Sequence, residues 1–115
     1  MTEFIKSFDE LEYYTQDGGP NITYQHLLPR GIAGENISMG LVTLQGPTKT
    51  DIGIHSEWLQ AYVVISGSGT VILGDKEIRV DRPGIINIPL NTPHGVRLDS
   101  GEEMQYLYVN NYTCK

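Results

Sequence analysis

Ile88-Pro89-Leu90-Asn91-Thr92-Pro93-His94 is the stretch that decides the fold of this chain. An apolar segment ends at a proline, a short turn carries Asn91, and a histidine opens the next segment. Asparagine tolerates the positive φ that many turns require, and proline restricts the backbone where the segment ends. The stretch therefore predicts a tight connection between two β-strands that directs the His94 imidazole toward the inside of a small barrel.

His55 and Gln60 precede this turn and are the other polar groups expected inside the barrel. Side chains alternate between the two faces of a strand, so Gln60 and Tyr62 are predicted to share one face. The odd spacing between His55 and Gln60 would place them on opposite faces of a regular strand. A bulge or loop around Ser56-Glu57 is therefore needed to bring both side chains inward.

Short runs rich in Val, Ile, Thr and Tyr alternate with Gly, Pro, Asn and Asp along most of the chain, which is typical of a β-sandwich or barrel. Strands are predicted at residues 21–28, 36–45, 60–66, 69–73, 77–80, 85–89, 94–98 and 104–110. Ser7-Phe8-Asp9-Glu10 has the form of a capping box and predicts one short N-terminal helix. At 115 residues we expect one domain over 1–115, with an N-terminal extension over 1–35 and the barrel core over 36–110.

Residues 53–67 resemble the first of two motifs that mark the cupin family. Gly67 takes the place of the glycine that closes this motif, and Gln60 stands where the family has glutamate. His55 matches the second histidine of the family's His-x-His pair, whereas Gly53 stands where the first histidine would be. Two of the four ligand places of the family therefore differ in this chain.

The second cupin motif is matched by the stretch around His94. Pro89, Asn91 and His94 take the places of its proline, glycine and histidine. Gly84 stands one residue closer to the proline than in the family pattern, and Leu98 replaces the final asparagine. The resemblance spans about residues 40 to 110 and implies an all-β fold, a double-stranded β-helix (cupin or jelly-roll) barrel. It also implies a homodimer, because small cupins commonly pair through their sheets.

The resemblance implies that His55, Gln60 and His94 bind a divalent transition metal, which would be Fe, Mn, Ni or Zn. Two imidazoles and one oxygen donor from different strand ends can hold such an ion and leave positions open for substrate. Gln60 supplies an oxygen without the negative charge of glutamate, so weaker binding and a more electrophilic metal are expected. The alternative is that both histidines are hydrogen-bonded barrel residues in a chain that binds no metal.

Other side chains are candidates for the walls of the same cavity. Tyr62 is a candidate acid/base or orienting group. The substrate-pocket candidates are Glu57, Trp58, Asn87, Tyr106, Tyr108 and His26. Glu57 also fits a solvated loop, and Trp58 also fits a core or dimer interface. Tyr106 and Tyr108 share one face of the last predicted strand, but the sequence does not say whether that face lines the cavity. Arg30 and His26 are candidate anion-binding groups at the mouth, and a structural or solvent role for each is the alternative.

Charge and cysteine content restrict the partners. The formal net charge is −6 and no run of Lys or Arg exceeds one residue, so no nucleic acid or anionic membrane partner is expected. Cys114 is the only cysteine, which excludes a disulfide within the chain. No segment has the length of a signal peptide core or a membrane span, and a cytoplasmic location is expected.

The sequence favours a metal-dependent cupin enzyme that acts on a small polar metabolite. Isomerase, epimerase, cyclase or lyase chemistry fits a metal that acts as a Lewis acid. An Fe(II) dioxygenase is less favoured with one histidine fewer. The competing hypothesis is a small-molecule or sugar-binding cupin without metal, and a purely structural role is weaker still. Function belongs to the site rather than the fold, so the substrate does not follow from the sequence.

Overall fold

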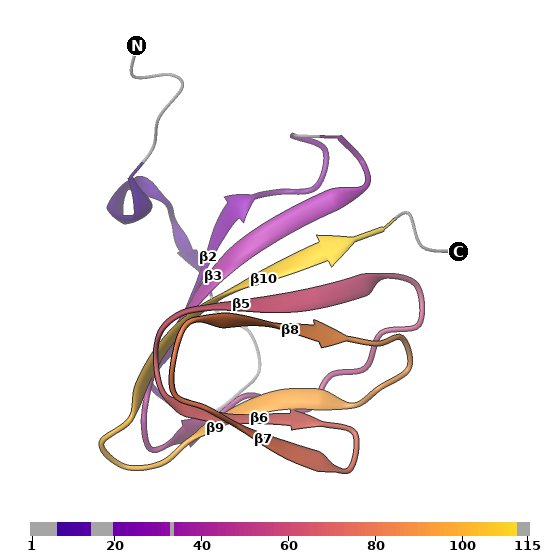
Figure 1. Cartoon of the computed structure of the whole chain (residues 1–115). Coiled ribbons are helices and arrows are strands. Elements are labelled where there is room, and N and C mark those ends of the chain that lie inside the picture. The colour runs from indigo at the N-terminus through magenta and orange to yellow at the C-terminus, as the bar shows by residue number, and fades with distance from the viewer. Residues whose placement is uncertain (1–6, 15–19, 33, 113–115) are drawn as a thin grey trace.

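The computed structural model describes residues 7–14, 20–32 and 34–112. Its strands are β1 (Tyr13–Tyr14), β2 (Ile22–Leu28), β3 (Ile37–Gln45), β4 (Thr48–Lys49), β5 (Leu59–Gly67), β6 (Gly69–Leu73), β7 (Lys76–Val80), β8 (Gly84–Ile88), β9 (His94–Leu98) and β10 (Glu103–Asn111). They form a six-stranded sheet of order β1-β2-β3-β10-β5-β8 and a four-stranded sheet of order β4-β9-β6-β7. In Figure 1 the sheet that holds β5 and β8 lies above the sheet that holds β6, β7 and β9. The predicted all-β jelly-roll fold is confirmed.

Each of the eight predicted strands is present, with ends within one residue of those expected. The alternation of apolar and polar residues is strong in these segments, because one face of each packs between the two sheets. β1 and β4 were not predicted. Each contains two residues, which is too short for any pattern to show.

The predicted N-terminal helix is wrong, because Phe8–Glu10 forms a single 3₁₀ turn. The Ser7 hydroxyl donates to the carboxylates of Asp9 and Glu10 and makes no capping bond to the backbone. Leu11 is already extended, with φ −90° and ψ 139°. The chain leaves the turn at once, and Tyr13–Tyr14 pairs with β2. Pairing with the sheet edge has therefore replaced further helical turns.

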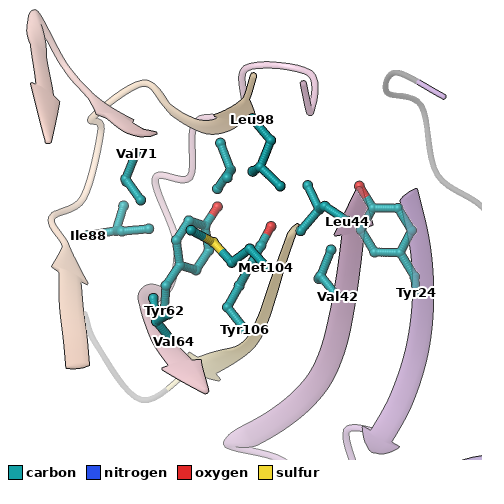
Figure 2. Close-up of a cluster of buried hydrophobic side chains, with 11 residues drawn as sticks. Tyr24, Val42, Leu44, Tyr62, Val64, Val71, Ile88, Leu98, Met104 and Tyr106 are labelled. Carbon is teal, nitrogen blue, oxygen red and sulfur yellow. The ribbon is translucent and has the colours of Figure 1, made fainter. Parts of the chain in front are cut away.

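The apolar core fills the space between the sheets (Figure 2). Val42 and Leu44 of β3, Val71 of β6 and Leu98 of β9 are each 1% exposed. Full burial of such a side chain contributes about 1.5–3 kcal/mol. Tyr24, Tyr62 and Tyr106 belong to the same buried cluster, so the core combines aliphatic side chains with a group of aromatic rings. No helix in residues 7–14, 20–32 or 34–112 has the length and apolar character of a membrane span.

Glu102 ties strand β7 to two connections, β5–β6 and β9–β10, at the end of the barrel where β9 stops. Its carboxylate accepts hydrogen bonds from Arg79, from the Ser68 hydroxyl at 3.0 Å and from the Asp99 backbone N–H at 2.9 Å. The hydrogen bond from Arg79 is the main cause that lowers the pKa of Glu102 to about 2, followed by the Asp99 N–H. His94, at the start of β9, lies at the opposite end of that strand.

Glu102→Gln is expected to lower the free energy of unfolding by about 1 kcal/mol at neutral pH, after allowance for screening at the exposed Arg79. The folded-state pKa lies below the ordinary 4.5, so the charged carboxylate stabilises the fold above that pH and the contribution is lost as the pH falls toward 2. Urea denaturation at several pH values should therefore show a shallower acid decline in the variant. Glu103→Gln, which changes an exposed neighbour, is the control. Equal acid profiles for Glu102→Gln and the unmodified protein would contradict the assignment.

Candidate functional site

A cavity of about 820 Å³ opens between the two sheets. Its walls come from β2, β3, β5, β9 and β10 and from the segment that precedes β5. Of the residues predicted from the sequence, the cavity is lined by His26, His55, Trp58, Gln60, Tyr62, His94, Tyr106 and Tyr108. The barrel thus brings together side chains that are far apart in the chain.

The turn before β9 positions His94 as the sequence predicts. Asn91 adopts a positive φ of 57°, and its N–H donates to the His55 carbonyl at 2.8 Å. His94 is 3% exposed, and its Nδ1 lies 2.9 Å from the Thr92 carbonyl oxygen. The carbonyl can only accept, so Nδ1 carries the proton and donates it. Nε2 therefore keeps its lone pair, as a metal-binding histidine requires.

His55 reaches the cavity because the segment before β5 joins the other sheet. Gly53 and His94 exchange two backbone hydrogen bonds of 2.9 Å, which fix this segment beside β9. The predicted break in the strand is therefore present between His55 and Gln60. The ring centroids of His55 and His94 lie 4.7 Å apart, and His55 stacks on Trp58 at 4.3 Å.

Burial is the main cause that lowers the pKa of His55, and the charge on a protonated His94 lowers it further. The nearby Gln60 amide acts in the opposite direction. The net effect favours the neutral imidazole, which is the form that binds a metal ion.

Gln60 is the third polar side chain of this group and lines the same cavity. Its Nε2 donates to Asn110 Oδ1 at 2.8 Å, while Oε1 is buried without a hydrogen-bond partner among the described residues. Asn110 Nδ2 donates in turn to Ser38 Oγ at 3.1 Å and to the Tyr112 hydroxyl at 3.3 Å. These bonds hold the amide so that its acceptor is left for another group. A buried polar atom without a partner is costly, which favours a ligand or water at this position.

Gly53 lies beside the imidazole rings of His55 and His94. A Cβ atom at Gly53 would lie 3.5 Å from His94 Nε2 and 3.9 Å from His55 Cε1, which is ordinary van der Waals contact. The motif comparison placed Gly53 where the family has its first histidine, and the position of Gly53 beside the two imidazoles agrees with that placement. The backbone brings a fourth ligand position to the site, but no side chain occupies it.

Tyr62 and Tyr106 form the apolar side of the site. Their ring centroids lie 4.6 Å apart, and the Tyr62 ring lies 6.0 Å from that of His94 (Figure 2 shows the two tyrosines side by side). Burial is the main cause that raises the pKa of both hydroxyls well above the usual value. Both groups therefore stay protonated at neutral pH, and Tyr62 suits a role as hydrogen-bond donor rather than as a group that transfers a proton.

Two predicted pocket residues are not among those that line the cavity. Asn87 is exposed on β8, because Ile86 and Ile88 take the inward positions opposite Tyr62 and Gln60. Its place on the outer face contradicts the prediction that it faces the cavity. Glu57 is also exposed, in the bend before β5, as the alternative of a solvated loop describes.

Several lining residues were missed by sequence reasoning. Asn110 and Tyr112 near the end of β10, Ser38 of β3 and Tyr24 of β2 were not singled out. The alternation that places Tyr106 and Tyr108 inward also places Asn110 inward, so the signal was present once the face was known. The pairing of Asn110 with Gln60 depends on the register between β10 and β5, which cannot be read from the sequence.

The donor set fits a divalent transition metal held by His55, Gln60 and His94. No group of three His, Cys, Asp or Glu side chains gathers anywhere in the described part of the chain, so the third donor here has to be an amide oxygen. All three donors are neutral, and such a set binds an ion more weakly than one with a carboxylate. The unpartnered Gln60 Oε1 and the free His94 Nε2 are the observations behind this fit.

Solved structures confirm the fold. The polyketide cyclase RemF from Streptomyces resistomycificus aligns with a TM-score of 0.81 and 20% identity, over 93% of this chain and 78% of that chain. A predicted oxalate decarboxylase from Thermotoga maritima aligns with a TM-score of 0.85 and 13% identity, over 94% and 98%. A cupin-2 domain protein from Rhodospirillum rubrum aligns with a TM-score of 0.78 and 15% identity, over 96% and 76%. At these identities the likeness concerns the fold alone.

A comparison with curated protein sequences finds no match to this chain. The cupin domain family, in contrast, matches residues 40–110, which is more than half of the sequence and includes the segments around His55, Gln60 and His94. That match agrees with the barrel, with its two antiparallel sheets and with the solved cupin structures that resemble it. The chain therefore belongs to the cupin domain family.

Proposed function

We propose that this protein is a metal-dependent cupin enzyme that acts on a small metabolite. The observation that carries the proposal is the meeting of three neutral donors, His55, Gln60 and His94, in one cavity, with Gln60 Oε1 buried and unpartnered among the described residues. Isomerase, epimerase, cyclase or lyase chemistry agrees best with this set. A dioxygenase is less favoured, because the site has one imidazole fewer than the family motif.

The residues of the cavity have distinct tasks under this proposal. A bound divalent metal would supply Lewis acidity toward a carbonyl oxygen of the substrate. His94 keeps Nε2 directed to the site through its hydrogen bond to Thr92. Asn110 accepts a hydrogen bond from the Gln60 amide and so fixes its position. Tyr62, with its raised pKa, stays protonated and donates a hydrogen bond to a developing oxyanion.

Two of the structural neighbours support an enzyme, because one is named a polyketide cyclase and another a predicted oxalate decarboxylase. The chemistry of this chain still depends on its own side chains, and its Gly53 and Gln60 distinguish the site from the family motif.

Elemental mass spectrometry tests the proposal directly. Protein purified without a metal-affinity column, or reconstituted with Fe(II), Mn, Ni or Zn and desalted, is expected to retain close to one equivalent of one metal. Binding should be lost on dialysis against a chelator and regained on return of the ion. Absence of any metal after all four reconstitutions would contradict a metal-dependent enzyme.

A binding protein without metal is the second candidate, and Gly53 is the observation that favours it. The position closest to both imidazoles has no donor, and Gln60 carries no charge. The cavity of about 820 Å³ would then hold a small molecule through its aromatic and polar walls. Thermal stabilisation by a ligand that is unaffected by chelator would favour this candidate.

A homodimer and a cytoplasmic location also remain proposals. Ile65 and Ile85 are 38% and 64% exposed on the outer face of the six-stranded sheet, where a second copy could cover them. Light scattering coupled to gel filtration would measure the mass directly, and a monomer at all concentrations would exclude the dimer. Cell fractionation would test the location.

A further inference from the structure

Arg30 differs from every other arginine of the chain. Ion pairs join Arg79 to Glu102, Arg82 to Asp81 and Arg97 to Glu77. Arg30 makes no such pair within the described residues and instead lines the cavity. Its guanidinium carbon lies 4.0 Å over the ring centroid of Tyr112, and its Nε donates to the Glu35 carbonyl. The charge is thus held in place by a ring and a carbonyl, and no carboxylate within residues 7–14, 20–32 or 34–112 forms an ion pair with it.

A row of aromatic rings connects Arg30 to His55, one of the candidate metal ligands. The Tyr112 ring lies 5.6 Å from Trp58, and Trp58 stacks on His55 at 4.3 Å. Five of the seven tyrosines and the only tryptophan line the cavity. Walls of this kind favour a flat ring, because aromatic faces and edges pack against one another. Trp58 Nε1 is also buried without a hydrogen-bond partner among the described residues.

The cavity as a whole is poor in negative charge. Asp51 is the only carboxylate among its lining residues, and it lies at an exposed position. The protein has a net charge of −6, so general attraction of anions is not expected. An anion that enters must therefore be recognised locally, and the fork of a guanidinium suits the two oxygens of a carboxylate.

We propose that the cavity binds a flat aromatic carboxylate, with its carboxylate at Arg30 and its ring against Tyr112 and Trp58. This inference names the substrate class of the proposed enzyme and so rests on the proposed function. It also agrees with the neutral ligand set, because the protein supplies no negative charge to a divalent ion at His55, Gln60 and His94. The two imidazoles line the same cavity as Arg30, Tyr112 and Trp58, so the far end of the ring system would lie toward them.

Calorimetric titration of the protein, stripped of metal by chelator, tests the inference without relying on activity. The probes are naphthoate, its neutral amide, and the saturated decalin carboxylate, which keeps the charge but loses the flat ring. Naphthoate is expected to bind at least about tenfold more tightly than either analogue, as a charge-assisted bidentate contact and ring stacking require. Arg30→Met should remove the preference of naphthoate over the amide.

Arg97→Met is the matched control, because Arg97 pairs with Glu77 on the outside of the barrel. It should retain the preference for naphthoate. Equal affinities for the acid and the amide, an unchanged preference in Arg30→Met, or no binding of naphthoate would each overturn the inference. Because the titration uses metal-free protein, a failure here is separate from the absence of metal that would contradict the proposed function.

Discussion

His94→Ala is expected to reduce metal affinity by more than about a hundredfold, since even the loss of a group that merely supports a ligand costs about 10–100-fold. His94 supplies the better prepared of the two imidazoles. It is 3% exposed, and its hydrogen bond to the Thr92 carbonyl leaves Nε2 free. Without it, His55 and Gln60 would remain as only two donors. Metal content after equilibrium dialysis is the measurement, and catalytic activity should disappear in parallel once a substrate is known.

His26→Ala is the matched control for this prediction, because His26 also lines the cavity but lies on β2. The His26→Ala variant should bind metal with the same affinity as the unmodified protein. His55→Ala provides a second test in case the loss of the buried His94 weakens folding, and thermal unfolding of each variant shows whether the barrel is intact. A folded His94→Ala protein that retains full metal would rule out His94 as a ligand.

Gly53→His is expected to raise metal affinity by at least about tenfold, because a correctly oriented extra ligand contributes on that scale in other protein metal sites. The Cβ atom would lie 3.5 Å from His94 Nε2, which is an ordinary van der Waals contact, so the first atom of the side chain is accommodated. The backbone at Gly53 does not adopt the positive φ that disfavours other residues. The substitution would supply the donor that the cupin motif has and this chain lacks. Competition with a metal-sensitive dye would measure the change.

Gly84→His provides the comparison, because Gly84 has open space around its Cβ position and is not among the residues that line the cavity. It adds a histidine without adding a ligand and should leave affinity unchanged. Gly53→His also separates the two candidate functions. A gain from weak to tight binding agrees with a native metal site, whereas binding that appears only in the variant would favour the metal-free candidate. Unchanged affinity in Gly53→His would refute the inferred geometry.

The sequence predicted those parts of the site that depend on local pattern. Alternation along β5 placed Gln60 and Tyr62 on one face, and the turn chemistry at Asn91 placed His94 inward. His55 required a break before β5, and the sequence showed only that one was needed. The actual cause is the pairing of Gly53 with His94 in the other sheet, which is a long-range contact.

The errors arose where tertiary pairing outweighed local signals. Asn87 was expected inside because a polar residue between isoleucines looked unusual, but the isoleucines on either side take the inward positions. The capping box at Ser7 predicted a helix, yet the chain there extends to pair with β2. Asn110 escaped notice because its role comes from the register that sets it opposite Gln60.

The stacking of Trp58 on His55 gives this protein a built-in optical reporter. Trp58 is the only tryptophan in the chain, and its ring lies 4.3 Å from that of His55. Its emission therefore comes from the wall of the cavity beside His55, without a background from other indoles. Fluorescence of the unlabelled protein can follow the occupancy of the barrel in real time, including in rapid-mixing experiments that resolve the order in which an ion and an organic molecule enter.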